Sequence, residues 1–224
     1  MVFLIGNFLL ILIYIYIFLV YYSSFYSSWD RVPYLGYVNG EVSVYMNFYE
    51  ISYNFFVAGG GANGGCVDSD DGSSRFHTHD NFWIYGGHKS DFDGHQKISY
   101  NNIMAFANVY GSRCLAIGMP VKGVDSNGVP FEEGYYNNTC ILESAGLEYL
   151  SIGGCSTNPN QYAVITHDNK IYAPNSSVVV TCGSTLNFTE WQATGLDPGT
   201  TVNDIPDTAT IIGWAANLLS IPQN

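Results

Sequence analysis

The stretch from residue 68 to residue 95 holds the densest group of side chains that could carry out acid–base chemistry. It contains six of the 19 Asp and Glu residues and four of the five His residues. Two carboxyl groups about 5 Å apart can cleave a glycosidic bond with retention, and a separation of about 6.5–9.5 Å suits inversion. Crowded carboxylates also raise one another's pKa, so that one stays protonated as general acid. We therefore expect the catalytic residues to be Asp70, Asp71, Asp93, His95 and Glu133.

Residues around this cluster are expected to bind the substrate. They are Asp68, Arg75, His88, Lys89, Asp91 and Tyr135, and further rings for stacking on sugars are offered by Trp83, Tyr85 and Tyr136. Turn chemistry is the alternative for each Asp, because Asp71-Gly-Ser and Asp93-Gly-His are common turn sequences in which Asp accepts backbone N–H bonds.

No cofactor or metal ion is expected at the cluster. Two metal sites remain as alternatives. The first is Zn²⁺ on His77, His79 and Asp80. The second is Ca²⁺ on the carboxylates of Asp68, Asp70 and Asp71.

A repeated strand unit must position these residues. An Asn precedes an apolar or aromatic stretch at Asn54, Asn81, Asn102, Asn138 and Asn169, in steps of 27, 21, 36 and 31 residues. Self-similarity of this length is typical of stacked repeats. We predict an all-β fold, a right-handed, single-stranded parallel β-helix (a solenoid) with coils about 4.8 Å apart. The five Asn side chains then form a structural ladder, and Asp71 and Asp93 lie on adjacent coils.

The predicted β-helix spans residues 28–194 and is expected to be truncated at its N-terminal end. The 36-residue step predicts an inserted loop between about Tyr110 and Glu133. Residues 195–224 are expected to form a turn-rich linker and then one helix near 207–219, with Asp207 or Thr208 as N-cap. This helix is predicted to cap the last coil, whose strand edges would otherwise be open.

The start of the chain differs from the rest in charge. The first 29 residues carry none, whereas 19 acidic and seven basic residues follow, for a net charge of −12. Residues 2–22 are long enough to span a membrane, so residues 1–24 are predicted to be an anchor. A signal peptide and mistranslated non-coding sequence are the alternatives. The acidic balance argues against nucleic acid and an anionic membrane surface as partners.

Three glycosylation sequons and the cysteine pattern indicate a secreted or cell-surface protein. The acceptor residues are Asn137, Asn175 and Asn187. None of the five cysteines forms a Cys-x-x-Cys pair, which argues against a zinc finger. Two candidate disulfides are Cys114 with Cys140 and Cys155 with Cys182, which would leave Cys66 as a buried thiol. The sequence leaves this connectivity open.

Four blocks resemble right-handed β-helix proteins of the pectin-lyase-like superfamily. They are residues 28–34 (SWDRVPY), 64–74 (GGCVDSDDGSS), 85–95 (YGGHKSDFDGH) and 133–142 (EGYYNNTCIL). Residues 195–200 (GLDPGT) resemble a turn near the end of many such chains. The resemblance covers about residues 28–219 and implies polysaccharide binding and cleavage in a groove along one sheet. Asp70-Asp71 resembles the Asp pair of polygalacturonases, whose Gly-His-Gly and Arg-Ile-Lys motifs are absent here.

The expected function is therefore a glycoside hydrolase with a polysaccharide or other glycan as partner. A neutral glycan is favoured, because seven basic residues make a poor groove for a polyanion. A polysaccharide lyase with Arg75 or Lys89 as base is the less favoured enzyme. The alternative is a non-catalytic surface protein that binds glycan or serves as a scaffold.

Overall fold

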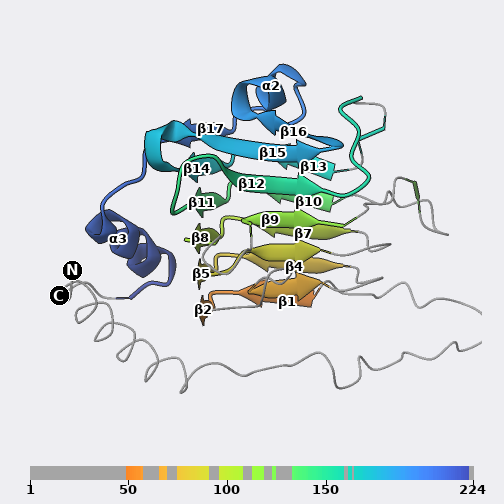
Figure 1. Cartoon of the computed structure of the whole chain (residues 1–224). Helices are drawn as coiled ribbons and strands as arrows, with labels where there is room; N and C mark the ends of the chain where they lie inside the picture. Colours follow the sequence, from red (N-terminus) through yellow and green to blue (C-terminus); the bar gives the residue numbers. More distant parts are fainter. Residues whose placement is uncertain are drawn as a thin grey trace, which may run out of the picture. The chain divides into compact units, whose positions relative to one another are not determined.

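The computed structural model describes residues 49–57, 66–69, 75–90, 96–107, 113–118, 123–124, 133–158, 161–162 and 164–221 (Figure 1). Most of these residues lie in or between short strands, and the helices among them are η1 (Pro174–Ser176), α2 (Phe188–Ala193) and α3 (Thr208–Leu218). None of these described helices is long and apolar enough to cross a membrane. The predicted anchor, residues 1–24, lies outside the described residues.

The strands form three sheets. Sheet 1 contains β1 (Tyr49–Ser52), β4 (Phe76–His79), β7 (Lys97–Tyr100), β10 (Glu133–Tyr136) and β13 (Val164–His167). Sheet 2 contains β2 (Phe55–Val57), β5 (Phe82–Ile84), β8 (Ile103–Ala105), β11 (Thr139–Ile141), β14 (Lys170–Tyr172) and β17 (Thr201–Asn203). Sheet 3 contains β3 (Val67–Ser69), β6 (His88–Ser90), β9 (Leu115–Ile117), β12 (Leu147–Ile152), β15 (Val178–Cys182) and β16 (Ser184–Asn187).

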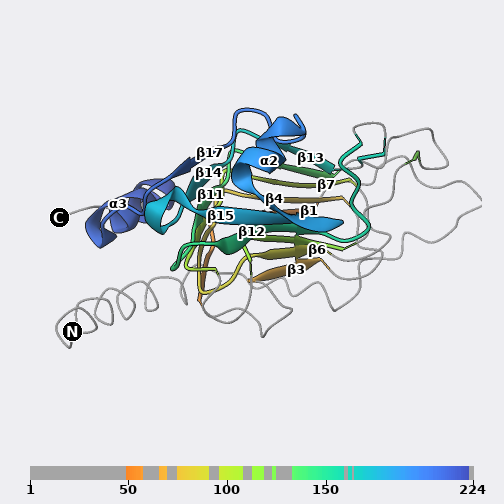
Figure 2. The same cartoon turned by 45° about the horizontal axis from the view of Figure 1, so that its top comes forward.

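The chain visits the three sheets in turn. Each strand from β1 to β12 pairs in parallel with the strand three positions further along, as β4 does with β7 and β5 does with β8. The exception is β16, which turns back and pairs antiparallel with β15. Figures 1 and 2 show the strands of each sheet stacked one above another. The described part is thus mostly β, with parallel strands in stacked sheets, an arrangement compatible with a β-helix.

The turn from sheet 1 to sheet 2 repeats one backbone geometry. Its first residue has a positive φ at Asp80 (52°), Asn101 (52°), Asn137 (54°) and Asp168 (54°), and Tyr53 (56°) holds the same place after β1. Asn and Asp enter this left-handed region more readily than other residues with a side chain. The recurrence of Asp or Asn after the strands of sheet 1 therefore has a local backbone cause.

The residue that follows each of these turn positions is the predicted ladder Asn. Asn81 Nδ2 donates to Asn102 Oδ1 at 2.9 Å, and Asn102 Nδ2 donates to Asn138 Oδ1 at 3.0 Å. The ladder ends at Thr200, whose Oγ1 accepts from the backbone N–H of Asn169 at 3.0 Å. Buried amides require such partners, because an unsatisfied one costs about 1–3 kcal/mol. The predicted structural role of the Asn repeat is confirmed.

Apolar side chains from all three sheets fill the interior, and two disulfides join neighbouring coils. Trp83, Met104, Leu115 and Leu150 each have 0% of their surface exposed. The bonds Cys114–Cys140 and Cys155–Cys182 are the two that the sequence suggested. Cys66 is only partly buried, and its Sγ lies 3.9 Å from the carbonyl oxygen of Ile84.

Two segments expected to be loops contribute strands. Residues Leu115–Ile117 fall inside the predicted insertion but form β9, because Leu115 and Ile117 point inward and the preceding Cys114 is tied to the next coil by its disulfide. Residues Thr201–Asn203 fall inside the predicted linker but form β17, which pairs with β14. Each of the two predicted connections therefore contains a strand.

A short helix that was not predicted from the sequence, α2, lies over the last coil (Figure 1). Asn187 and Glu190 form a capping box at its start, and Trp191 is fully buried, with its Nε1 donating to Asp197 at 3.1 Å. The helix α3 exists as predicted, with Asp207 as N-cap. It lies beside sheet 2 in Figure 1, where the Trp214 ring contacts Tyr172 of β14. A C-terminal helix is therefore present as predicted, and α2 is a second helix that lies over the last coil.

Candidate functional site

Most of the predicted catalytic residues lie outside the described residues, and their roles stay predictions. They are Asp70, Asp71, Asp93 and His95, and the same applies to the predicted substrate-binding residue Asp91. The strands that lead to them are described. Ser69, the last residue of β3, is paired with Ser90, the last residue of β6. The chain therefore leaves two neighbouring strands of sheet 3 at paired positions just before both acidic segments.

The remaining catalytic candidate, Glu133, lies in the interior. It is 2% exposed, and its Oε1 lies 3.2 Å from the ammonium of Lys97, which is 1% exposed. Its other oxygen accepts from the hydroxyls of Ser90 at 3.1 Å and Tyr135 at 2.8 Å. We name the side chains of Ser69, His88, Ser90, Lys97, Glu133 and Tyr135 the inner polar cluster. Within it, the charge of Glu133 is matched by Lys97 and out of contact with solvent.

His88 enters the same cluster from β6. Its ring is 2% exposed, its Nε2 lies 3.5 Å from Ser69 Oγ, and its edge contacts are with Trp83 and Tyr135. Burial, with a smaller contribution from the Lys97 cation, lowers the pKa of His88 to about 3. Burial also raises the pKa of Tyr135, and the Glu133 carboxylate adds to that rise. His88 and Tyr135 are therefore both uncharged near neutral pH and do not present a charge to a substrate.

Strand alternation separates the predicted substrate-binding residues into two groups. On β6, His88 and Ser90 are buried while Lys89 between them points outward. Lys89 Nζ lies 3.0 Å from the carboxylate of Asp68 on β3. Arg75 Nε donates to Gln96 at 3.0 Å. His88 and Tyr135 are thus brought together with Glu133 inside, whereas Asp68 and Lys89 meet on the outer face.

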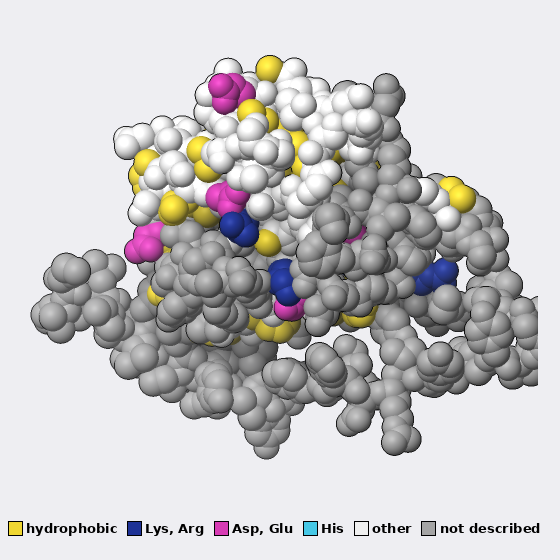
Figure 3. Space-filling model, turned by 45° about the vertical axis from the view of Figure 1, so that its right-hand side comes forward, with side chains coloured by type: hydrophobic (Ala, Val, Ile, Leu, Met, Phe, Trp, Pro, Cys, Tyr) yellow, Lys and Arg dark blue, Asp and Glu magenta, His cyan; other side chains and the backbone are white. Residues whose placement is uncertain are grey.

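The outer face that includes sheet 3 is mixed in charge. Figure 3 shows the described Lys and Arg side chains of this view mostly next to Asp or Glu side chains. Arg113 makes an ion pair with Glu148, as Lys89 does with Asp68. Surface pairs that keep contact with solvent contribute little to stability, about 0–1 kcal/mol each. In each pair the opposite charge of the partner weakens the attraction that the side chain would exert on a charged ligand.

A ladder of stacked rings, which the sequence reading missed, follows the outer ends of sheet 1. His79, Tyr100, Tyr136 and His167 stack with ring centroids 4.7, 5.5 and 4.8 Å apart. Each is the last residue of its strand, two positions before a ladder Asn, and that spacing is the signal which could have revealed it. The ring faces cover one another along the ladder, so Tyr136 is poorly placed to stack on a sugar.

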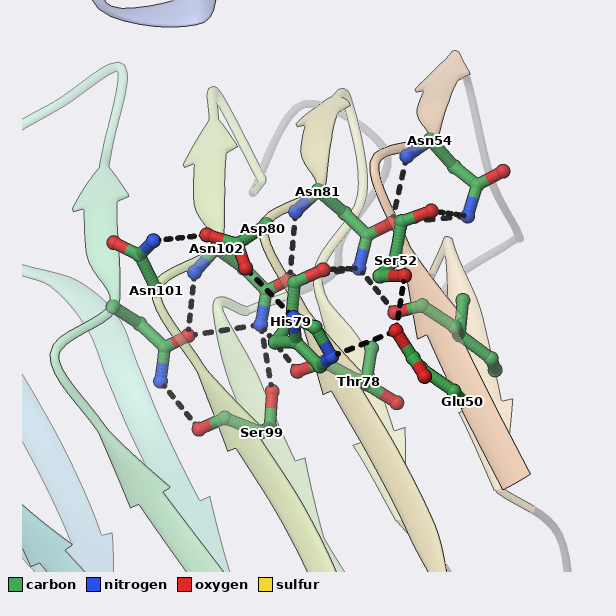
Figure 4. Close-up of polar contacts among 12 residues, drawn as sticks. Glu50, Ser52, Asn54, Thr78, His79, Asp80, Asn81, Ser99, Asn101 and Asn102 are labelled. Carbon is green, nitrogen blue, oxygen red and sulfur yellow. Dashed lines mark hydrogen bonds and ion pairs between the residues drawn. The ribbon is translucent and has the colours of Figure 1, made fainter. Parts of the chain in front are cut away.

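The histidine at one end of this ring ladder is held by carboxylates. His79 Nδ1 lies 2.7 Å from Asp80 Oδ2, and its Nε2 lies 3.3 Å from Glu50 Oε1 (Figure 4). At the other end His167 Nδ1 lies 2.7 Å from Asp168 Oδ2. Burial lowers the pKa of the neighbouring His77, and the charge of His79 lowers that pKa further. Hydrogen bonds to the following Asp therefore orient the terminal rings of the ladder.

The described part of the chain contains no candidate metal site. No group of three or more His, Cys, Asp or Glu side chains there is placed to hold an ion. His79 and Asp80 of the zinc alternative are engaged with each other. Two of the three calcium candidates, Asp70 and Asp71, lie outside the described residues.

Comparison with protein families, curated proteins and solved structures finds no match to this chain. The functional argument therefore rests on the residues and their geometry.

Proposed function

We propose that this protein is an extracytoplasmic, right-handed parallel β-helix of the pectin-lyase-like kind that acts on carbohydrate as a glycoside hydrolase. The observation that carries the proposal is the pairing of Ser69 with Ser90. Paired strands lie about 4.8 Å apart. The two acidic segments therefore start from adjacent points on one sheet, which supports the proposal of a pair of catalytic carboxylates there.

Each candidate has a role in this proposal. Asp70, Asp71 and Asp93 supply the general acid and the base or nucleophile, and His95 relays or orients a proton. Asp68 and Lys89, exposed on the strands before both segments, would contact substrate hydroxyls. Glu133 takes a structural part instead, because its carboxylate is buried against Lys97.

Two features support the extracytoplasmic location. The disulfides Cys114–Cys140 and Cys155–Cys182 suit an oxidising compartment. The uncharged segment at residues 2–22 would direct or anchor the chain there.

A non-catalytic role as a glycan-binding or scaffold protein is the second candidate. It is favoured because the described carboxylates near β3 and β6 are paired with lysines. Asp68 is paired with Lys89, and Glu133 is paired with Lys97. If the acids of the following segments serve their turns in the same way, no catalytic carboxylate is left.

A hydrolysis screen decides between the two. The purified chain is incubated with neutral and anionic polysaccharides, beside the variants Asp71→Asn and Asp93→Asn. Asp168→Asn is the matched control, because Asp168 is an exposed turn residue of sheet 1, away from β3 and β6. We expect both test variants to lose at least about 100-fold in rate, the lower range of general acid–base catalysis, while the control keeps its rate. Equal activity in all four proteins would remove Asp71 and Asp93 from the mechanism.

A further inference from the structure

The three sequon asparagines share a property that the ladder asparagines lack. Asn137, Asn175 and Asn187 are all exposed. Among the described residues, none of their side-chain Nδ2 atoms donates a hydrogen bond. The ladder residue Asn138, next to Asn137 in sequence, is 1% exposed and donates from Nδ2 to the carbonyl of Ser99 at 2.9 Å. The amide nitrogens that a glycan needs are thus available at the three sequons and engaged in the ladder.

The bonds that these three residues do make would survive glycosylation. Asn187 is the N-cap of α2, and its Oδ1 accepts from the backbone N–H of Glu190 at 3.0 Å. Asn175 uses its backbone N–H, which donates to Asp204 Oδ1 at 3.1 Å. Asn137 uses its backbone N–H in the turn after β10. Substitution at Nδ2 leaves every one of these oxygen and backbone contacts in place.

Two of the sequons border one hollow of the surface. The hollow has a volume of about 390 Å³ and is lined by Ser176, Ser177, Val178, Asn187, Phe188, Thr189 and Glu190. It lies beside β16, which among the described strands is the last of sheet 3, paired with β15 and followed directly by α2 over the last coil. Edge strands invite association with other chains, and cover by a helix or loop prevents it. N-linked glycans are bulky and solubilising and extend such cover. Sugars attached at Asn175 and Asn187 would cover this end of sheet 3.

We propose that Asn137, Asn175 and Asn187 carry N-linked glycans, and that the two at the hollow add to the protection that α2 gives this end of sheet 3 (Figure 1). The inference rests on the extracytoplasmic location proposed above. In the reaction, Nδ2 bonds to the anomeric carbon of an oligosaccharide held on a lipid pyrophosphate. The bond from that carbon to the pyrophosphate oxygen breaks, and the amide proton is lost. The secretory pathway supplies the lipid-linked donor and the transferase.

The test is expression of the full chain in eukaryotic cells, followed by peptide mass spectrometry. Enzymatic removal of an N-glycan converts its Asn to Asp, which marks the site. Because Asn187 is also a cap, the sequons are broken at their hydroxyl residues, with Ser177→Ala and Thr189→Ala. Thr189→Ser is the matched control, since it keeps a hydroxyl at the third position. We expect each Ala variant to lose one glycan step on a gel and the Ser variant to keep it.

A second form of the chain carries an added secretion signal. Comparing it with the native chain separates failure of the glycosylation inference from failure of the proposed location. Glycans at all three residues of the native chain support the inference. Glycans only in the signal-bearing form would overturn it together with the proposed location, because the native chain would then never meet the donor. Unmodified asparagines in both forms would overturn the inference and leave the proposed location standing. Unchanged self-association of the Ser177→Ala, Thr189→Ala double variant would refute the protective role of the two glycans at the hollow.

Discussion

The ion pair between Lys97 and Glu133 offers the sharpest test of the interior. The two residues are directly opposite in the register of β7 and β10, and both side chains are at most 2% exposed. Glu133→Gln keeps the size of the side chain but removes the charge that faces the buried ammonium. Breaking a buried pair at one partner costs about 3–5 kcal/mol, because the other charge is left in a medium that solvates it poorly.

That loss is large against the whole stability of a domain, which is about 5–15 kcal/mol. Lys97→Met should cost about as much or less, since Glu133 keeps the hydroxyls of Ser90 and Tyr135 and can take up a proton. In the double variant both charges are gone. We therefore expect it to be less destabilised than the sum of the single variants by about 2–3 kcal/mol.

The measurement is the free energy of unfolding from urea titrations at neutral pH, followed by circular dichroism. The exposed pair Asp68 and Lys89 is the matched control, and Asp68→Asn should change that free energy by less than about 1 kcal/mol. Two results would refute the reasoning: a loss of under about 1 kcal/mol for Glu133→Gln, or simple additivity in the double variant. Either would mean that the carboxylate is solvated or not coupled to Lys97.

Two further predictions follow from the interior. Asn102→Ala removes the acceptor of the Asn81 amide at the centre of the ladder, and the free energy of unfolding should fall by about 3–5 kcal/mol. The control is Asn101→Gly at the neighbouring exposed position, which should change that free energy by less than about 1 kcal/mol. Equal losses in the two variants would contradict the structural role of the ladder. Because burial and the Lys97 cation lower the pKa of His88 from 6.5 to about 3, the unfolded chain takes up the proton first as pH falls. The contribution of His88 to stability is therefore complete above about pH 6.5 and declines towards pH 3 by about 1.4 kcal/mol per unit. A His88→Phe variant with the same slope from pH 7 to about pH 4 would contradict this assignment.

Much of the fold could be predicted because its causes are local. A left-handed turn residue followed by an Asn recurs once per coil, and both preferences act within a few residues of sequence. The two disulfides join cysteines 26 and 27 residues apart, about one coil, although the spacing alone left their connectivity open. The capping box of α2 was equally local, with Asn187 and Glu190 three residues apart, and it was overlooked because the helix has only six residues.

The candidate site depended on facts that no local pattern contains. Glu133 was expected to be a third catalytic carboxylate because it is acidic and lies near a strand. The side of the strand that it faces follows from β10 pairing with β7, which places Lys97, 36 residues earlier, directly opposite. The stacked rings of sheet 1 likewise follow from the register of four strands.

The sequence by itself thus determined the repeat, the Asn ladder and the residues able to form disulfides, because backbone preference and short-range spacing decide them. Only the tertiary structure decided which charges lie inside. A charged side chain is tolerated in the interior when a neighbouring coil brings the opposite charge to the paired position. For Glu133 that partner is Lys97, and for Asp68 the partner is Lys89 on the outer face. The same composition of acids could serve either arrangement, and the register of the strands selects between them.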